Sequence, residues 1–192
     1  MANPALKVPT YDDILALGEG VHAEILAGEL RVHAAPSWQH GDAAMALAGD
    51  LDAPFRRGRG GPGGWWLLPE TDLVMCTGDC VRPDFTGIRR EKMPVLPDER
   101  PLVVDPDFVC EILSPSTRLY DETEKLEAYA AAGVQHVWHL DPHARLLTVM
   151  RHSPDGYVIL RRGRPGQLLR LPPFEAIEID IAGLFPLERT TP

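Results

Sequence analysis

The chain has 192 residues, of which 44% are hydrophobic and 24% are charged, and its formal net charge is −9 at pH 7. This length predicts one domain over residues 1–192, with its core at about 10–180, and the composition excludes fibrous, collagen-like and wholly disordered proteins. The negative charge argues against a broad basic surface for nucleic acid, because Lys and Arg supply much of the affinity for phosphate.

The cellular compartment can be predicted from apolar runs and cysteines. No run approaches the roughly 20 apolar residues of a membrane span, and the first ten residues lack the features of a signal peptide. Cys76, Cys80 and Cys110 are an odd number at no disulfide-framework spacing. A zinc site at Cys76 and Cys80 would need a second pair of ligands, which does not accompany them. We therefore expect a cytoplasmic protein with reduced thiols and no membrane contact.

The N-terminal region predicts a short helix and a hairpin. Thr10 followed by Asp13 resembles a capping box and predicts a helix over about 10–18. The segment 22–32 has a glycine-containing turn between two short runs, which is typical of a hairpin. Glu24 is thereby placed on a strand.

A long alanine-rich helix follows. Ser37 is a good N-cap residue, and the apolar spacing of Leu47 and Leu51 continues the helix to about Arg56 with one face turned toward a sheet. The glycine-rich loop 58–64 lacks the Gly-Lys-Ser/Thr ending of a phosphate-binding loop. It is therefore interpreted as a flexible connection.

The remaining pattern predicts strands around one further helix. The strands are expected at about 65–68, 72–76, 81–88, 108–113, 135–140, 146–152, 157–162 and 176–179. A loop with several prolines spans 93–106, and a helix over about 119–132 ends at Gly133. Strand, helix and strand from 108 to 140 should form a right-handed parallel crossover. The prediction is an α/β protein, a mixed sheet flanked by helices, with an N-terminal hairpin and antiparallel C-terminal strands.

Two carboxylates interrupt apolar strands. Asp84 follows Val81-Arg82-Pro83, and Glu111 lies within Phe108–Leu113. A buried carboxylate is costly unless it is paired or bound to metal, and two on neighbouring strands can hold a hard cation such as Mg²⁺. The pattern leaves open that each lies at a strand end, solvated or paired with an arginine.

Three further side chains are candidates for the same site. Lys125 lies one helical turn before Tyr129 and can lean toward the carboxylates, although a lysine in this setting is more often a solvated surface residue. A nearby cation would stabilise charge on phosphate and orient water. Glu24 and His40 are weaker candidates, as a third carboxylate and as a histidine in the first turn of the long helix.

Arginines and lysines gather in three places. These groups are Arg56, Arg57 and Arg59; Arg89, Arg90 and Lys92; and Arg161, Arg162 and Arg164. The fold would have to bring them together to make a patch for phosphate. The alternative is that they lie on separate solvated loops.

Several of these motifs together resemble one known family. They are Pro83-Asp84, Glu111-Ile112-Leu113-Ser114-Pro115-Ser116-Thr117, Asp121, Lys125, Tyr129, Gly133-Val134, Trp138 and Asp141-Pro142, with Glu24–Leu30 and His40 before them. Over about residues 10–180 the chain resembles the Uma-two family of predicted restriction endonucleases.

The resemblance implies a PD-(D/E)XK restriction-endonuclease-like fold in which Asp84 and Glu111 bind Mg²⁺ or Mn²⁺. The lysine that usually stands two residues after the glutamate is absent, because Leu113 occupies that position. Lys125 matches the place from which the family supplies a lysine on the next helix. The backbone carbonyl of Cys110 is a further candidate ligand.

The function we expect is therefore a Mg²⁺-dependent endonuclease that hydrolyses phosphodiester bonds of nucleic acid, with DNA as the expected substrate. The competing hypothesis is a catalytically inactive protein of the same fold that binds nucleic acid or a protein partner, since fold does not fix function. A homodimer would suit an enzyme that cuts two strands, but the sequence identifies no interface for it.

Overall fold

The computed structural model describes residues 8–186 of the chain. Its helical elements are α1 (Tyr11–Leu15), α2 (Trp38–Leu51), the π-helical turn η1 (Asp52–Arg56), α3 (Arg118–Glu122), α4 (Glu124–Ala131) and the 3-10 helix η2 (Ile181–Leu184). Two predicted N-termini are confirmed. Thr10 and Asp13 form the capping box of α1, and the Ser37 side chain accepts a hydrogen bond from the His40 N–H (3.3 Å) at the start of α2.

The strands form two mixed sheets and one small pair. The first sheet has the order β2 (Glu29–His33), β1 (His22–Leu26), β5 (Cys80–Val81), β4 (Leu73–Val74) and β7 (Leu102–Val103). The second has the order β11 (Gly156–Gly163), β10 (Leu146–Ser153), β9 (His136–Asp141), β8 (Phe108–Ile112), β6 (Phe85–Arg89) and β3 (Trp65–Pro69). The pair is β12 (Leu168–Leu169) with β13 (Ile179–Asp180). The predicted mixed sheet, N-terminal hairpin and antiparallel C-terminal strands are confirmed.

Strand β8 is the central strand that separates two packing layers. Cys110 and Ile112 belong to a core that includes Leu47 and Leu51 of α2. Val109 belongs to the other core, which includes Ala128 and Tyr129 of α4. Because side chains alternate along a strand, Glu111 lies on the α4 side with Val109. Glu111 therefore points toward α4, and α2 covers the opposite face of the sheet.

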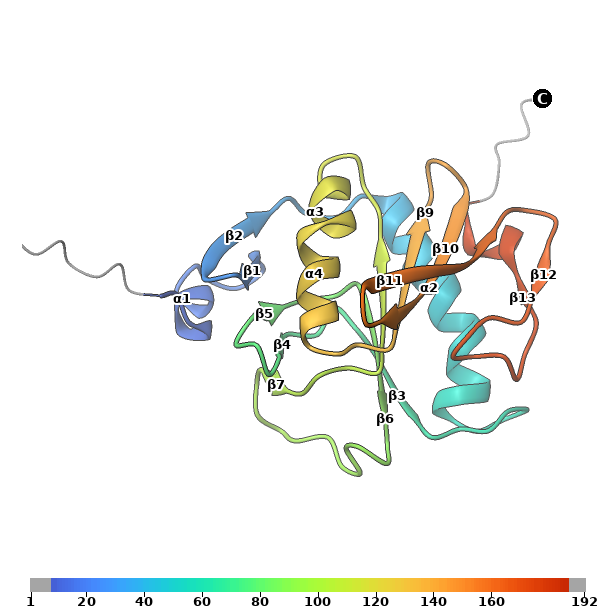
Figure 1. Ribbon diagram of the computed structural model, residues 1–192, viewed down its shortest axis with the longest axis horizontal. Coiled ribbons are helices and arrows are strands. Elements are labelled where there is room, and N and C mark those ends of the chain that lie inside the picture. The colour runs from blue at the N-terminus through green and yellow to red at the C-terminus, as the bar shows by residue number, and fades with distance from the viewer. Residues whose placement is uncertain (1–7, 187–192) are drawn as a thin grey trace, which may run out of the picture.

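The arrangement in space follows these layers (Figure 1). The hairpin β1–β2 and α1 lie at one end of the molecule, and the β12–β13 pair lies at the other. Helices α3 and α4 stand between the hairpin and strand β9. Strand β8 is parallel to β9, with Glu111 paired to His139, which confirms that the predicted crossover joins parallel strands. A side chain on α4 can thus reach both the hairpin and the end of β8.

One predicted strand is divided between the two sheets. The segment expected over 81–88 ends as β5 at Val81 and resumes as β6 at Phe85. Pro83 explains the break, since it has no N–H to donate to a ladder. Asp84 follows that proline directly, so it stands at the junction of the two sheets rather than in the middle of either.

The helix predicted over 119–132 is likewise divided. Thr123 separates α3 from α4 with φ −125° and ψ −83°. Its hydroxyl donates to the Leu119 carbonyl, and such back-bonding competes with the backbone ladder of a helix. Tyr120 of α3 and Tyr129 of α4 nevertheless pack into the same core cluster.

Other boundaries differ in smaller ways. The loop expected over 93–106 contains the two-residue strand β7, and the strand expected over 176–179 is reduced to β13. Short edge pairings of this kind leave little periodicity in a sequence. Within residues 8–186 no helix has both the length and the apolar character that crossing a membrane requires.

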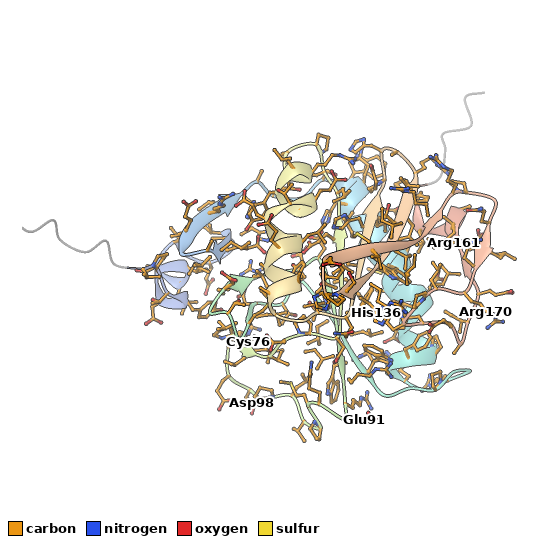
Figure 2. The ribbon with its side chains drawn as sticks, in the orientation of Figure 1. Cys76, Glu91, Asp98, His136, Arg161 and Arg170 are labelled. Atoms are coloured by element: carbon orange, nitrogen blue, oxygen red, sulfur yellow. The ribbon has the colours of Figure 1, made fainter. Side chains whose placement is uncertain are left out.

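The three groups of basic residues do not form one patch. The guanidinium of Arg90 donates to the Arg56 carbonyl (2.8 Å), so the first two groups adjoin. Arg56 and Arg57 are both paired with Asp52 (2.8 and 2.5 Å), which offsets their charge. Arg161 of the third group lies on β11, well apart from Glu91 beside the second (Figure 2). The alternative of separate solvated segments is closer to the structure.

Candidate active site

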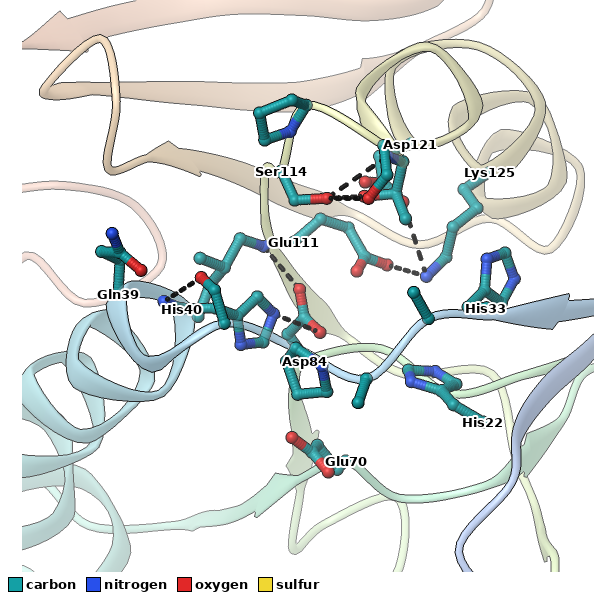
Figure 3. Close-up of a pocket in the computed structure, with 18 of the residues that line it drawn as sticks. His22, His33, Gln39, His40, Glu70, Asp84, Glu111, Ser114, Asp121 and Lys125 are labelled. Atoms are coloured by element: carbon teal, nitrogen blue, oxygen red, sulfur yellow. Dashed lines mark hydrogen bonds and ion pairs between the residues drawn. The ribbon is translucent and has the colours of Figure 1, made fainter.

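A cavity of about 320 Å³ lies where β8 ends, and the predicted site residues line it (Figure 3). Its walls come from the hairpin, the segment from residue 33 to the first turn of α2, the turn at Glu70, the loop 114–117 and helices α3 and α4. Asp84, Glu111, Lys125, Glu24 and His40 are all among the lining residues. Segments far apart in the sequence therefore meet at one place.

Asp84 is fixed by two hydrogen-bond donors. Its Oδ2 accepts a hydrogen bond from the Ile112 N–H (2.6 Å), and its Oδ1 lies 2.9 Å from the His40 Nε2. Burial alone would lower the pKa of His40, but the hydrogen bond and charge of Asp84, followed by the charges of Glu70 and Asp121, raise it above its usual value. His40 therefore orients the carboxylate of Asp84 together with the Ile112 N–H.

Lys125 is a buried cation held by carboxylates. It is 3% exposed, and its Nζ lies 2.7 Å from Glu111 and 3.2 Å from Glu24. Asp121, one turn earlier, stands 4.0 Å away. Burial opposes the charged form, but Glu111 and Glu24 raise the pKa of Lys125 well above its ordinary value. The ammonium group is therefore kept protonated at the base of the cavity.

Glu24 is the carboxylate most strongly held in its ionised form. It accepts a hydrogen bond from the Arg82 N–H (2.7 Å), and its second oxygen lies 3.1 Å from His33 Nε2. Although burial raises its pKa, Lys125 together with His33 and the Arg82 N–H lowers it to about 2. Glu24 is thus a fixed counter-ion that reaches Lys125 from the first sheet.

The pKa of Glu111 is shifted in the opposite direction to that of Glu24. It is 1% exposed, it accepts a hydrogen bond from the Tyr129 hydroxyl, and Lys125 lies beside it. Burial, aided by the charges of Asp84, Asp121 and Glu24, nevertheless raises its pKa well above the ordinary value. Three buried acidic side chains, Glu111, Glu24 and Asp121, thus lie within 4.0 Å of one lysine, and Asp84 lines the same cavity. A cation bound beside Glu111 would favour the ionised form of its carboxyl group.

The donor set suits a hard divalent cation. No group of three or more His, Cys, Asp or Glu residues is arranged to hold a metal ion in the part of the chain that is described. Mg²⁺ usually needs only one or two protein carboxylates, because water and substrate phosphate complete its coordination. Asp84 and Glu111 line the same cavity and provide that number. Cys110 does not line it, whereas Ile112 does, so the cavity gives no support to the Cys110 carbonyl as a ligand.

Several site residues were not predicted as such. Asp121 was named only within the family resemblance, Tyr129 was named there and as a neighbour of Lys125 on its helix, and His33 was not predicted. A register argument identifies His33: Glu24 pairs with Arg31 across the hairpin, so the residue two positions beyond Arg31 shares the face of Glu24. The signal was therefore present in the hairpin pattern.

Known proteins can now be compared with this geometry. The family model described as "Uma2: Putative restriction endonuclease" matches residues 8–182. The chain belongs to the Uma2 family. No curated protein matches the chain. A solved structure, titled a putative nuclease belonging to DUF820 from Anabaena variabilis, is similar with a TM-score of 0.73 and 19% sequence identity, over 92% of this chain and 97% of that one.

The comparisons bear out the fold and the family that the sequence indicated. The Uma2 match includes every lining residue of the cavity, since these lie between His22 and His143. The structural likeness shows a nuclease-like fold of the same type. The Uma2 chain thus places its buried acidic residues and its lysine on a fold shared with a protein that is titled a putative nuclease.

Asp121→Asn should stabilise the protein at pH 8 and leave it nearly unchanged at pH 4. Burial raises the pKa of Asp121 to about 6, despite the opposing effects of Lys125 and Thr117. Because the pKa of Asp121 in the folded protein exceeds the ordinary value of 3.8 for an aspartate, the protein loses stability as pH rises from about 4 through 6. The gain at pH 8 should be on the order of 1–3 kcal/mol.

Chemical denaturation at both pH values measures this difference. The exposed carboxylate Glu122, on the same helix, provides the control as Glu122→Gln, which should show no comparable dependence on pH. An equal effect of Asp121→Asn at pH 4 and pH 8 would mean that the charge of Asp121 is not the cause.

Proposed function

We propose that this chain is a metal-dependent endonuclease that hydrolyses phosphodiester bonds, with DNA as its substrate. The observation that carries the proposal is the convergence of Asp84, Glu111 and Lys125 in one cavity, on a fold of the nuclease type. In this hydrolysis two acidic residues would bind the metal ion, and the metal ion and the lysine would together stabilise the negative charge that develops on phosphate.

Asp84 and Glu111 would hold Mg²⁺ or Mn²⁺. When bound, such an ion polarises a phosphate oxygen, which contributes several kcal/mol of stabilisation to the transition state. His40 keeps Asp84 oriented, and Tyr129 does the same for Glu111. These contacts fix the two carboxylates before any ligand arrives, so little reorganisation is needed at the moment of reaction.

Lys125 would act on the attacking water and on the charge that develops at phosphate. Its ammonium group is protonated and already directed into the cavity by Glu111 and Glu24. A single donor placed in this way contributes about 3–4 kcal/mol, which is a factor of roughly 10²–10³ in rate. Glu24 is a positioning residue in this scheme, because it acts through Lys125.

The test is cleavage of supercoiled plasmid and of single-stranded DNA by the purified protein with Mg²⁺ or Mn²⁺. We expect cleavage that EDTA stops and that Glu111→Ala lowers by at least about 10²-fold. Glu124→Ala, which removes a half-exposed carboxylate from α4, should cleave like the wild type. Inactivity of the wild type on both substrates with both metals would overturn the proposal and favour a binding protein of the same fold.

A further inference from the structure

The groups proposed to react with phosphate lie deep in the cavity. Glu111 and Lys125 are 1% and 3% exposed, and Asp84 is 8% exposed. The cavity measures about 320 Å³ and is lined by segments that lie far apart in the sequence. Duplex DNA is stiff over about 150 base pairs and carries its phosphates on a convex surface. A flexible single strand can bend a phosphodiester into such a cavity much more easily than a duplex can.

The charge around the cavity also disfavours a duplex. Apart from histidines, its charged lining residues are one lysine, Lys125, and five carboxylates: Glu24, Glu70, Asp84, Glu111 and Asp121. Arginine is absent from this lining, within the residues that the structure describes. Duplex binding draws most of its affinity from rows of Lys and Arg on phosphates. Because the lining offers phosphate a single cation, Lys125, contacts other than charge would strengthen the binding of nucleic acid at this cavity.

Trp38 offers such a contact beside the cavity. It is 69% exposed, and its chain neighbours Ser37 and Gln39 both line the cavity. Met45, two turns along the same face of α2, is 73% exposed. Both side chains line a shallow hollow next to Phe185.

The exposure of this indole is unusual for the chain. Trp65 and Trp138 are at most 1% exposed and belong to the core. Trp66 is held by a hydrogen bond to the Met93 carbonyl (2.8 Å) and by Arg90 above its ring. Exposed aromatic rings stack the unpaired bases of single strands, alongside basic contacts to the backbone.

We propose that the substrate is a single-stranded nucleic acid, whose phosphodiester enters the cavity while a neighbouring base stacks on Trp38. This inference rests on the proposed nuclease function for its cleavage step, but the stacking step concerns binding alone. The two steps can therefore be tested separately.

Binding is measured first, by fluorescence anisotropy of a labelled 15-nucleotide DNA strand in EDTA, where hydrolysis cannot occur. Trp38→Ala should weaken binding of the strand about 5- to 100-fold, since stacking of one base contributes roughly 1–3 kcal/mol. Trp38→Phe should retain most of the affinity. Val103→Ala, at an apolar side chain that is 74% exposed on β7, is the control and should bind like the wild type.

Cleavage is then compared between the same strand, its blunt duplex and an RNA strand of the same sequence, with Mg²⁺ or Mn²⁺. We expect the preferred single strand to be cut at least tenfold faster than the duplex, and the DNA and RNA arms identify which sugar is accepted. Equal rates on strand and duplex would overturn the inference, as would unchanged binding by Trp38→Ala, which would assign the hollow to another partner such as a protein. Trp38-dependent binding without any cleavage would retain the stacking site and reject the nuclease.

Discussion

Lys125→Met should lower the free energy of unfolding by about 3–5 kcal/mol and abolish cleavage. The substitution keeps most of the side-chain volume, but it leaves Glu24 and Glu111 buried without their shared cation. Breaking a buried ion pair by removing one partner has a cost of this size, because the remaining charge stays uncompensated. Activity should fall at least about 10²-fold, since the donor to water and phosphate is lost. Urea denaturation and a plasmid-nicking assay measure the two effects.

A matched control lies on the same helix and hairpin. Arg31 of β2 pairs with Glu124 of α4 at 2.6 Å, with side chains that are 34% and 43% exposed. Arg31→Met should cost less than about 1 kcal/mol, because exposed pairs contribute little. If Lys125→Met proved no more destabilising than Arg31→Met, the buried network would not be the electrostatic centre described here. Lys125→Met at full activity would remove the lysine from the mechanism.

Asp84→Asn should remove the binding of divalent metal and, with it, the stabilisation that metal gives. A ligand that binds only the folded state at 100 times its dissociation constant adds about 2.7 kcal/mol to stability. In the wild type, Mg²⁺ or Mn²⁺ should therefore raise the melting temperature by several degrees. In Asp84→Asn the shift should be absent, because the carboxamide offers a neutral and weaker oxygen. Calorimetric titration with Mn²⁺ and thermal melts check the prediction.

Asp107→Asn is the appropriate comparison. Asp107 also accepts a backbone hydrogen bond, from the Arg89 N–H at 2.8 Å, but it lies outside the cavity. Its variant should bind metal like the wild type. If metal raised the melting temperature of Asp84→Asn as much as that of the wild type, Asp84 would not be a metal ligand.

Much of the fold could be predicted because its long elements repeat with clear periods. The cap at Ser37, the apolar face of α2 and the crossover around β8 and β9 all follow from local patterns. The breaks at Pro83 and Thr123 did not follow, since tertiary pairing decides where a strand changes sheets or a helix bends. Proline could have suggested the first of them.

The carboxylates of the candidate site could be predicted from the sequence, but the side chains that contact them were harder to predict. Asp84 and Glu111 stand out because a charge inside an apolar strand is costly. Lys125 was a candidate from its place on the helix after β8, and the resemblance strengthened it. Its contact with Glu24 joins distant segments, which no local pattern encodes. His33 could have been found from the hairpin register. The homodimer stays a prediction.

Glu24 and Glu111 hold the same ammonium group from two different sheets, and this has a consequence for assembly. The hairpin is synthesised long before α4, yet neither can complete the site alone. Separation of the hairpin from α4 would leave Lys125 with half of its compensation, so the network couples the two sheets into one cooperative unit. In the proposed nuclease, the site would therefore be complete only after this long-range contact has formed.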